Sequence, residues 1–460
     1  MSDKITTSCV GLDQILEGGI PANTITVLMG APGTGKTILA EAIAFFNATP
    51  ENPALYLTTL SEPLEKFIFH GQRYRFFDVS KVGVSVIYED IGTMVRKAGV
   101  ESLASIVTDL LVKYKPSFLF IDSFKALNEL LPSTGERRTV IYDLATVLTT
   151  YKCTSFLIGE YSESMTTDLP EFAIADVVLN LMKYSTNVRE QRFLRVEKLR
   201  GSGSIPGLHA FTINEHGIEM YPRLLSPPVA PTYEPKVERV NTGITGLDEM
   251  IEKGFWRGST TLVAGPSGSG KTLMALHFIR EGVRNGERSL FVGFQENPAQ
   301  MARIMHSLGW NAAELLEDSN FELMYRSPVE MQLDSVAAEI FERVRAGKVS
   351  RLVIDALGDL ERCSIDIQRF ADFIYALTQW FAVENVTCIM TSELAELFEF
   401  RRISDQQISN ISDNLVLLGF TPGEEMERTI RIIKTRGSNH DNRQHLLEIS
   451  DQGVSVKKVK

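Results

Sequence analysis

Short hydrophobic runs alternate with amphipathic stretches along the whole chain. The runs at Thr24–Met29 and Thr260–Ala264 predict buried strands, and each leads into a glycine-rich segment. Apolar residues then recur at helical spacing over Lys36–Phe46 and Lys271–Glu281. Because strands that alternate with helices are typical of parallel sheets, we predict an α/β fold with helices on both faces of each sheet. Further strands are predicted at Ala54–Thr59, Ser289–Phe294, Phe118–Ile121 and Leu352–Ile354.

The same order of segments occurs twice. Corresponding residues lie 235 or 236 positions apart, for example from position 11 to position 246. Since this period has the size of a domain, it indicates tandem duplication and not a solenoid of short repeats. The recurring segments are Gly11–Asp13 with Gly246–Asp248, Gly30–Thr37 with Gly265–Thr272, and Lys198–Ser202 with Lys434–Ser438.

A proline-rich stretch separates the two copies. Residues 226–235 contain four prolines, which neither a helix nor an inner strand accommodates. We predict a semi-extended linker there, between a first domain at residues 1–225 and a second at residues 236–460.

Composition and charge narrow the class of protein. The 460 residues include 47 Lys and Arg against 58 Asp and Glu, a net charge of −11, which disfavours a broadly basic surface for nucleic acid. No apolar run reaches the roughly 18 residues of a membrane helix, and the N-terminus has no signal-like stretch. The four cysteines lie far apart without a CxxC pair, so we expect reduced thiols in a cytoplasmic protein.

Both copies contain the GxxxxGK[ST] motif between a predicted strand and a predicted helix. Glycines let the backbone wrap closely around phosphate groups, and the helix N-terminus offers free N–H donors. Lys36 and Lys271 would contact the β- and γ-phosphates of a nucleotide. The hydroxyls of Thr37 and Thr272 would bind Mg²⁺. A glycine-rich turn with a chance lysine is the alternative, and the recurrence of the motif argues against it.

An aspartate ends a buried strand downstream of each motif, at Asp122 and Asp355. Parallel sheets bind ligands at the carboxyl ends of their strands, and a carboxylate there can hold the metal. Alone this signal is weak, because many strands end in aspartate. After a phosphate-binding loop it predicts a Walker B strand.

Basic pairs follow later in each copy, Lys198 with Arg200 and Lys434 with Arg436. Each pair alone is best read as a solvated hairpin tip. Their recurrence beside duplicated phosphate-binding loops favours contact with phosphate, and an arginine acting from a neighbouring subunit would be an arginine finger.

With these motifs the chain resembles KaiC, the circadian-clock ATPase and autokinase of the RecA superfamily, over nearly its whole length. The specific stretches are Lys198–Ile218, Ile403–Asp413 and Lys434–Asp441. The resemblance implies two tandem RecA-like P-loop domains, a homohexamer of two stacked rings, and Mg²⁺ and ATP bound between subunits.

The resemblance also implies which residues bind ATP. In the first copy they are Gly33, Thr34, Gly35, Lys36, Thr37 and Ile38, with Lys198, Leu199, Arg200, Ser202, Ser204, Asn214 and Glu215 from the neighbouring subunit. In the second copy they are Gly268, Ser269, Gly270, Lys271, Thr272 and Leu273, with Arg428, Lys434, Thr435, Arg436, Ser438 and His440 from the neighbour. The family often has His where this chain has Ser204.

The chain departs from the family at the catalytic base. Family members have two adjacent glutamates after the next strand, and the leading one acts as general base. Here the pairs read Ser61-Glu62 and Gln295-Glu296. Loss of a positioned base typically costs about 10²–10⁴-fold in rate. We therefore expect a slow ATPase in which Glu62 and Glu296 are the substitute bases, whereas phosphate binding is retained.

Two further departures concern regulation. The family's adjacent Ser-Thr phosphorylation pair reads Ser409-Asn410, which leaves one acceptor, and Ser409 could equally be a helix-surface or N-cap serine. The chain ends at Lys460, so we expect no tail of the kind that the KaiA partner stimulates. A KaiB-like or other signalling protein is the expected partner.

Three functions remain open on this basis. The first is a slow ATPase with autokinase activity at Ser409. The second is a DNA motor like RadA or DnaB, which Cys153–Met182 disfavours because it contains five acidic residues and no Lys or Arg. The third is a scaffold whose assembly is controlled by nucleotide without catalysis, which the lost leading glutamates favour over the DNA motor.

Overall fold

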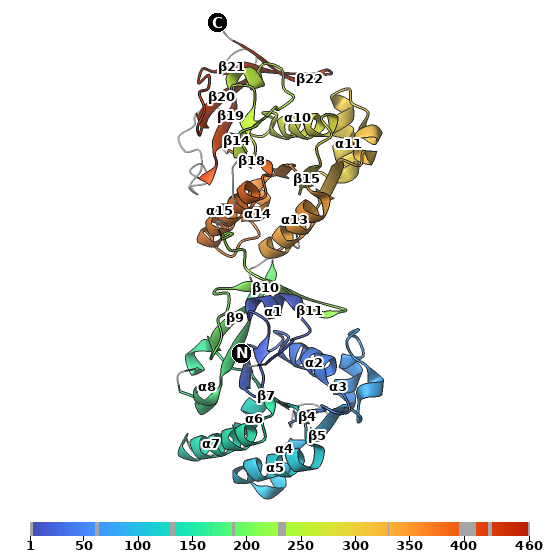
Figure 1. Cartoon of the computed structure of the whole chain (residues 1–460), viewed down its shortest axis with the longest axis vertical. Coiled ribbons are helices and arrows are strands. Elements are labelled where there is room, and N and C mark those ends of the chain that lie inside the picture. Colours follow the sequence, from blue (N-terminus) through green and yellow to red (C-terminus); the bar gives the residue numbers. More distant parts are fainter. Residues whose placement is uncertain are drawn as a thin grey trace. The chain divides into compact units, whose positions relative to one another are not determined.

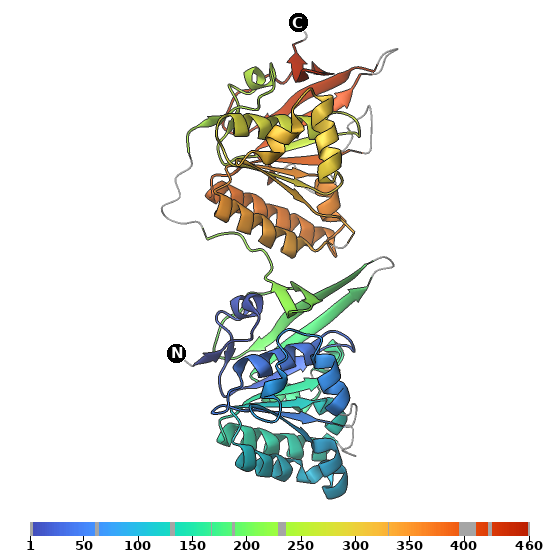
Figure 2. The same ribbon diagram turned by 90° about the vertical axis from the view of Figure 1, so that its right-hand side faces the viewer.

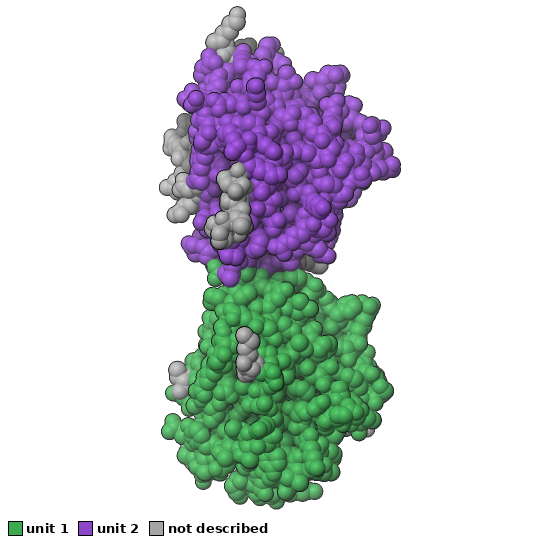
Figure 3. Space-filling view, in the orientation of Figure 1, with its two compact units in different colours: residues 1–223 green, residues 224–460 purple. Residues whose placement is uncertain are grey.

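The computed structural model describes residues 3–59, 64–128, 134–166, 168–185, 189–228, 236–329, 331–394, 411–421 and 426–458. The chain forms two compact units, Met1–Arg223 and Leu224–Lys460, coloured separately in Figure 3. Of the expected linker, residues 229–235 lie outside the described part.

The first unit is built on a nine-stranded sheet of order β11-β10-β9-β8-β3-β7-β6-β4-β5. The six strands from β8 to β5 are parallel, and β9, β10 and β11 extend one side as antiparallel strands. Figure 2 shows β8 and β9 as a long two-stranded ribbon along that side. The sheet strands are β3 (Ile25–Met29), β4 (Ala54–Thr58), β5 (Val86–Asp90), β6 (Phe118–Asp122), β7 (Thr154–Gly159), β8 (Val177–Ser185), β9 (Glu190–Leu199), β10 (His209–Asn214) and β11 (Gly217–Tyr221), while β1 (Lys4–Ile5) and β2 (Ile20–Pro21) pair separately.

Helices cover both faces of this sheet (Figure 1). Successive residues of a strand point to opposite faces, so Leu28 packs in a core with α1 and α2, whereas Val27 and Met29 pack in a second core with α4 to α8. The helices are α1 (Val10–Ile15), α2 (Lys36–Asn47), α3 (Leu64–Gly71), α4 (Ile91–Ala98), α5 (Leu103–Tyr114), α6 (Phe124–Asn128), α7 (Thr134–Thr150) and α8 (Pro170–Ile174), with 3₁₀ turns at Val79–Lys81, Val100–Ser102 and Glu163–Met165.

The second unit repeats this topology strand for strand. Its sheet has the order β22-β21-β20-β19-β14-β18-β17-β15-β16, with the six strands from β19 to β16 parallel. The strands are β14 (Thr260–Gly265), β15 (Ser289–Gly293), β16 (Phe321–Tyr325), β17 (Arg351–Asp355), β18 (Thr387–Glu393), β19 (Asn414–Phe420), β20 (Arg428–Thr435), β21 (His445–Ser450) and β22 (Gly453–Lys457), and β12 (Arg239–Val240) pairs with β13 (Phe255–Trp256). The helices are α9 (Leu247–Met250), α10 (Lys271–Arg284), α11 (Pro298–Ser307), α12 (Ala312–Glu317), α13 (Leu333–Gly347), α14 (Leu357–Glu361) and α15 (Ile367–Val383).

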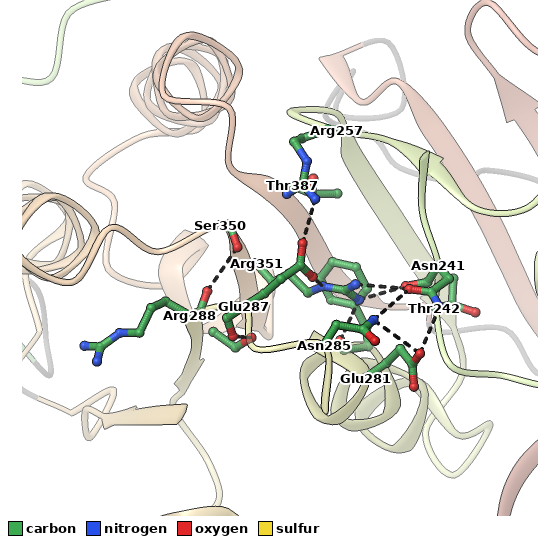
Figure 4. A network of polar contacts seen from close by, with 12 residues as sticks. Asn241, Thr242, Arg257, Glu281, Asn285, Glu287, Arg288, Ser350, Arg351 and Thr387 are labelled. Atoms are coloured by element: carbon green, nitrogen blue, oxygen red, sulfur yellow. Dashed lines mark hydrogen bonds and ion pairs between the residues drawn. The ribbon is translucent and has the colours of Figure 1, made fainter. Parts of the chain in front are cut away.

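A buried arginine distinguishes the second unit (Figure 4). Arg351 begins β17 and is 1% exposed, whereas the first residue of the corresponding strand β6 is Phe118. Its guanidinium donates to the carbonyl oxygens of Asn241 (2.7 Å) and Phe278 (3.0 Å) and pairs with the carboxylate of Glu287. It therefore connects three segments of the unit: the stretch after β12, helix α10 and the turn that precedes β15.

The predicted fold class is confirmed, since both sheets are mostly parallel and carry helices on both faces. The predicted strands agree with the observed ones to within a residue at each end. The prediction ended the second phosphate-loop helix too early, at Glu281, since α10 continues to Arg284. The next residue of the helix is Gly282. A Cβ at this position would lie 2.5 Å from the Cδ of Arg351, so the packed arginine leaves room only for glycine. None of the described helices has both the length and the apolar composition of a membrane span.

Candidate nucleotide sites

Each phosphate-binding loop joins the carboxyl end of a central strand to a helix. In the first unit β3 leads through residues 30–35 into α2, and in the second β14 leads into α10. Gly33 and Gly35 have φ of 71° and 101°, in the left-handed region that other residues avoid. Gly268 and Gly270 repeat this geometry at 76° and 102°. The backbone path of both loops thus requires the motif glycines at these positions.

The loop lysines fold back over their own loops. The ammonium of Lys36 donates to the carbonyl oxygens of Gly30 (2.9 Å) and Ala31 (2.8 Å). Lys271 does the same to Gly265 and Pro266, both at 2.8 Å. Burial lowers the pKa of both lysines, while acidic neighbours oppose that shift. An anionic phosphate would supply the counter-charge that a buried ammonium needs.

The motif threonine and the strand-end aspartate meet in both units. Thr37 donates to Asp122 at 2.7 Å, and Thr272 donates to Asp355 at 2.7 Å. Two hard oxygen donors held together beside a phosphate loop suit Mg²⁺, which favours carboxylate, phosphate and water ligands. Burial raises the pKa of Asp355, and hydrogen bonds from Thr391 and Thr272 act against that rise.

Different side chains hold the two aspartates in place. In the first unit the hydroxyl of Tyr56, in β4, donates to Asp122 at 3.1 Å. In the second unit the hydroxyl of Thr391, in β18, donates to Oδ1 of Asp355, whose Oδ2 accepts from Thr272. The two sites therefore share the hydrogen-bonded threonine and aspartate and differ in the second side chain that holds the aspartate.

An open cleft lies over each loop, with a volume of about 450 Å³ in the first unit and about 320 Å³ in the second. Both volumes fall within the range of small-molecule sites. The first cleft is lined by Gly33, Gly35, Lys36, Thr37, Ile38, Thr58, Thr59, Asp122, Ser123, Gly159 and Glu160. The second is lined by Ser267, Gly268, Gly270, Lys271, Thr272, Leu273, Gln295, Glu296, Asp355, Ala356, Glu393, Arg428 and Ile449.

The predicted bases can be located in the second unit. Strand β15 ends at Gly293 and α11 begins at Pro298, so Gln295 and Glu296 lie in irregular backbone, and both line the cleft. The amide of Gln295 donates to Asp359 at 3.0 Å. Glu296 is half-buried, and burial followed by the charge of Asp355 raises its pKa. The corresponding Ser61 and Glu62 lie outside the described residues.

The basic pairs lie where the central parallel strands begin, at the end of each strand opposite to the phosphate loop. Asp176 accepts from the N–H of Ile25, the first residue of β3, and lies 3.5 Å from Arg200. Asp413 likewise accepts from Thr260 at the start of β14 and lies 3.5 Å from Arg436. Lys198 donates to the carbonyl of Phe172 at 3.0 Å, and Lys434 to that of Ser412. Each pair and its own phosphate loop are thus at opposite ends of the same strand.

Three residues that are expected to act from the neighbouring subunit are close to the phosphate loop of their own unit. Arg428 begins β20, donates to the carbonyl of Gly268 at 2.9 Å and lines the second cleft. Asn214 and Glu215 form the turn between β10 and β11, and the strand residue before them, Ile213, lies 2.9 Å from the Cβ position of Gly35. The sequence could not separate them from the basic pairs, because the antiparallel strands carry the chain from one edge of the sheet to the other and back.

The remaining predicted residues serve local contacts. Thr34 and Ser269 are fully buried, and the Thr34 hydroxyl donates to the carbonyl of Ala31 at 2.9 Å. Ser202 accepts from Lys4 at 2.7 Å. Thr435 bonds to the carbonyl of Ser438 (3.1 Å) and to the ring of His440 (2.9 Å), which closes the loop after β20. Leu199 ends β9, Ser204 is partly exposed in the loop that follows, and Ser409 lies outside the described residues.

Sequence reasoning missed several cleft residues. Glu160 and Glu393 line the two clefts, and Tyr56 and Thr391 orient the aspartates. Only the glutamates left a signal, since each follows the hydrophobic strand after the Walker B strand in its own copy.

Comparison with known proteins agrees with this arrangement. A family model of the KaiC ATPase matches residues 5–224 and again residues 240–460. The circadian clock oscillator protein KaiC of Rippkaea orientalis is 28% identical over 477 residues, covering 98% of this chain and 88% of that protein. Its counterpart in Synechococcus elongatus is 27% identical over 472 residues, covering 99% and 89%. The circadian clock protein KaiC3 of Synechocystis sp. is 28% identical over 473 residues, covering 99% and 92%. Because the family model accounts for both units, each with a RecA-like sheet and a phosphate-binding loop, the chain belongs to the KaiC family of ATPases.

Proposed function

We propose that both clefts bind Mg·ATP and hydrolyse it slowly, and that the basic pair of a neighbouring chain completes each cleft. The observation that carries this proposal is the separation of each pair from its own phosphate loop. Strand β3 joins Asp176, the partner of Arg200, to the loop that begins at Gly30. Its five residues span about 16 Å at roughly 3.3 Å per residue.

An arginine at that distance cannot reach the phosphate of its own site. Arg200 and Arg436 are nevertheless well exposed, at 59% and 57% of their side chains, and their ion pairs at 3.5 Å are long. Such a surface ion pair contributes little stability, and the exposed guanidinium of Arg200 can exchange its pair for a stronger anion. A head-to-tail contact in which one chain's pair meets the next chain's cleft generates a closed ring if the rotation closes. We expect six chains per ring by resemblance to the family.

Asn214, Glu215 and Arg428 belong to the other half of this interface. Since they lie beside the loop of their own unit, we propose that they contact the nucleotide bound there and not the one on the neighbour. The guanidinium of Arg428 would reach a phosphate or the ribose from the rim of the second cleft.

Autophosphorylation at Ser409 is the finer part of the proposal and rests on the resemblance of Ile403–Asp413 to the phosphorylated segment of the family. The phosphoryl group would pass from ATP on Lys271 and Thr272 to the serine hydroxyl of an adjacent chain. We expect at most one phosphate on this segment, because Asn410 replaces the second acceptor.

A scaffold controlled by nucleotide is the second candidate. It is favoured by Gln295, whose amide is bonded to Asp359 and cannot accept a proton from water or serine. The names of the relatives refer to circadian clocks, so under either candidate we propose a role in timing or signalling with a KaiB-like partner.

One experiment separates the candidates. Purified full-length protein is incubated with Mg·ATP, and phosphate release, light scattering and intact mass are followed together. We expect assembly, slow phosphate release and a gain of one phosphate that Ser409→Ala removes. Assembly without release or mass gain would support the scaffold, and a monomer that is unchanged by Mg·ATP would refute both.

A further inference from the structure

Two glutamates outside the sequence motifs hold the same place in the two clefts. Glu160 directly follows β7, and Glu393 ends β18. In each sheet this strand lies between the phosphate-loop strand and the Walker B strand, as β7 lies between β3 and β6. The carboxyl end of that strand therefore falls in the middle of the site, between the loop lysine and the aspartate.

Strand register brings each glutamate next to the loop lysine. Glu393 is paired with Gly265 of β14, whose carbonyl accepts from Lys271. In the first unit the last pair of β3 and β7 is Met29 with Gly159, so Glu160 lies opposite Gly30, whose carbonyl accepts from Lys36. Of the acidic groups that oppose the lowered pKa of the lysines, Glu160 and Glu393 act most strongly.

The strand-end aspartates of the clefts are less suited to activating water, which leaves Glu296 as the competing acidic group in the second cleft. Asp355 accepts hydroxyl hydrogen bonds on both oxygens, from Thr272 and Thr391. Both donors of Asp122, Thr37 and Tyr56, bond to its Oδ2 atom. These hydrogen bonds hold both aspartates beside the motif threonines, where the Mg²⁺ ion would bind. By contrast, Glu160 and Glu393 are exposed and line the clefts.

We propose that Glu160 and Glu393 orient and deprotonate the water that attacks the γ-phosphate in their own clefts, in place of the leading glutamate that this chain lacks. The water oxygen forms a bond to the γ-phosphorus as the bond to the bridging oxygen of ADP breaks. One water proton passes to the glutamate and then to the released phosphate, so the carboxylate is regenerated. This inference rests on the proposed function, since it requires that the clefts hydrolyse ATP.

The test uses Glu160→Gln, Glu393→Gln and the double variant in the full chain. Phosphate release is measured at saturating Mg·ATP, and nucleotide binding is measured separately with a fluorescent ATP analogue. We expect the double variant to lose about 10²-fold in kcat, as for loss of a general base, while it still binds ATP. Glu51→Gln and Glu317→Gln remove exposed carboxylates elsewhere on each unit and serve as matched controls.

Restoring the family residue sharpens the test. In a Gln295→Glu background the second cleft regains a base in the segment after β15, so Glu393→Gln should lower the rate less than it does in the wild type. Two results would overturn the inference alone: a wild type that hydrolyses ATP while the double glutamine variant keeps its full rate, or glutamine variants that change only the affinity for ATP. A wild type that binds ATP and never releases phosphate would instead refute the proposed hydrolysis, and the assignment of these glutamates with it.

Discussion

At the scale of single residues, we expect His277 to make the free energy of unfolding of the second unit depend on pH. It lies in α10, is 7% exposed, and its Nε2 accepts from the N–H of Val454 at 2.9 Å. The ring of Trp310 packs edge-on against it at 4.8 Å. Burial, with a smaller contribution from Arg280, lowers the pKa of His277 from 6.5 to about 4. Protonation would also break the bond to Val454.

We therefore predict that acid destabilises the second unit through this side chain. Above pH 6.5 the imidazole is neutral in both the folded and the unfolded chain, so it contributes no pH dependence. As pH falls from 6.5 toward 4, the unfolded chain takes up the proton first, and the free energy of unfolding falls by up to about 3 kcal/mol.

The measurement is chemical unfolding followed by tryptophan fluorescence, because all three tryptophans, Trp256, Trp310 and Trp380, belong to the second unit. His277→Gln keeps an acceptor for Val454 without the titrating ring. Its loss of stability between pH 7 and pH 5 should be smaller than that of the wild type, and equal losses would contradict the prediction.

At the scale of elements, the network around Arg351 holds the second unit's first segment to its sheet (Figure 4). Glu287 pairs with Arg351 and, at 2.6 Å, with Arg257, which follows β13. Asn241, just after β12, receives two bonds from Arg351. The contacts join the small β12–β13 sheet to β15, β17 and α10.

We predict that Arg351→Met costs about 3–5 kcal/mol, the usual effect of removing one partner from a buried ion pair. Glu287, Asn241 and Phe278 would each lose a donor. Arg284→Met, an exposed change at the last residue of α10, should stay within about 0.5 kcal/mol. Urea unfolding read by tryptophan fluorescence checks this, and coincident midpoints for the two variants would show that the network contributes little.

At the scale of the whole molecule, interface-completed sites allow two inactive chains to restore each other. One chain carries Lys36→Ala and Lys271→Ala, so its loops are defective. The other carries Arg200→Ala and Arg436→Ala, so its basic pairs are defective. Each alone should release almost no phosphate, because each ring lacks one half of every site.

Mixing the two chains in equal amounts should recover up to about one quarter of the wild-type rate, since that share of head-to-tail contacts joins an intact loop to an intact pair. Phosphate release and light scattering are recorded on the same mixture. Co-assembly without recovery would argue that the pairs do not act on a neighbour's nucleotide.

Much of this architecture is determined by the sequence itself. The duplication, the strand-loop-helix units and the position of Lys36, Thr37 and Asp122 at one cleft follow from residue spacing within short segments, which can be read directly from the sequence. The same holds for the strands that carry them, whose ends differ by at most one residue from the prediction.

Only the tertiary structure decided on which edge of the sheet each later residue lies. Lys198 and Asn214 are near in sequence and were predicted to act together, yet one antiparallel strand places them at opposite edges. Glu160 became part of the cleft through the order of strands, which inserts β7 between β3 and β6. Helix α10 has a glycine at position 282 because the side chain of Arg351, which is distant in sequence, occupies the space beside it. In each case the deciding contact joins segments far apart along the chain, which local spacing does not encode.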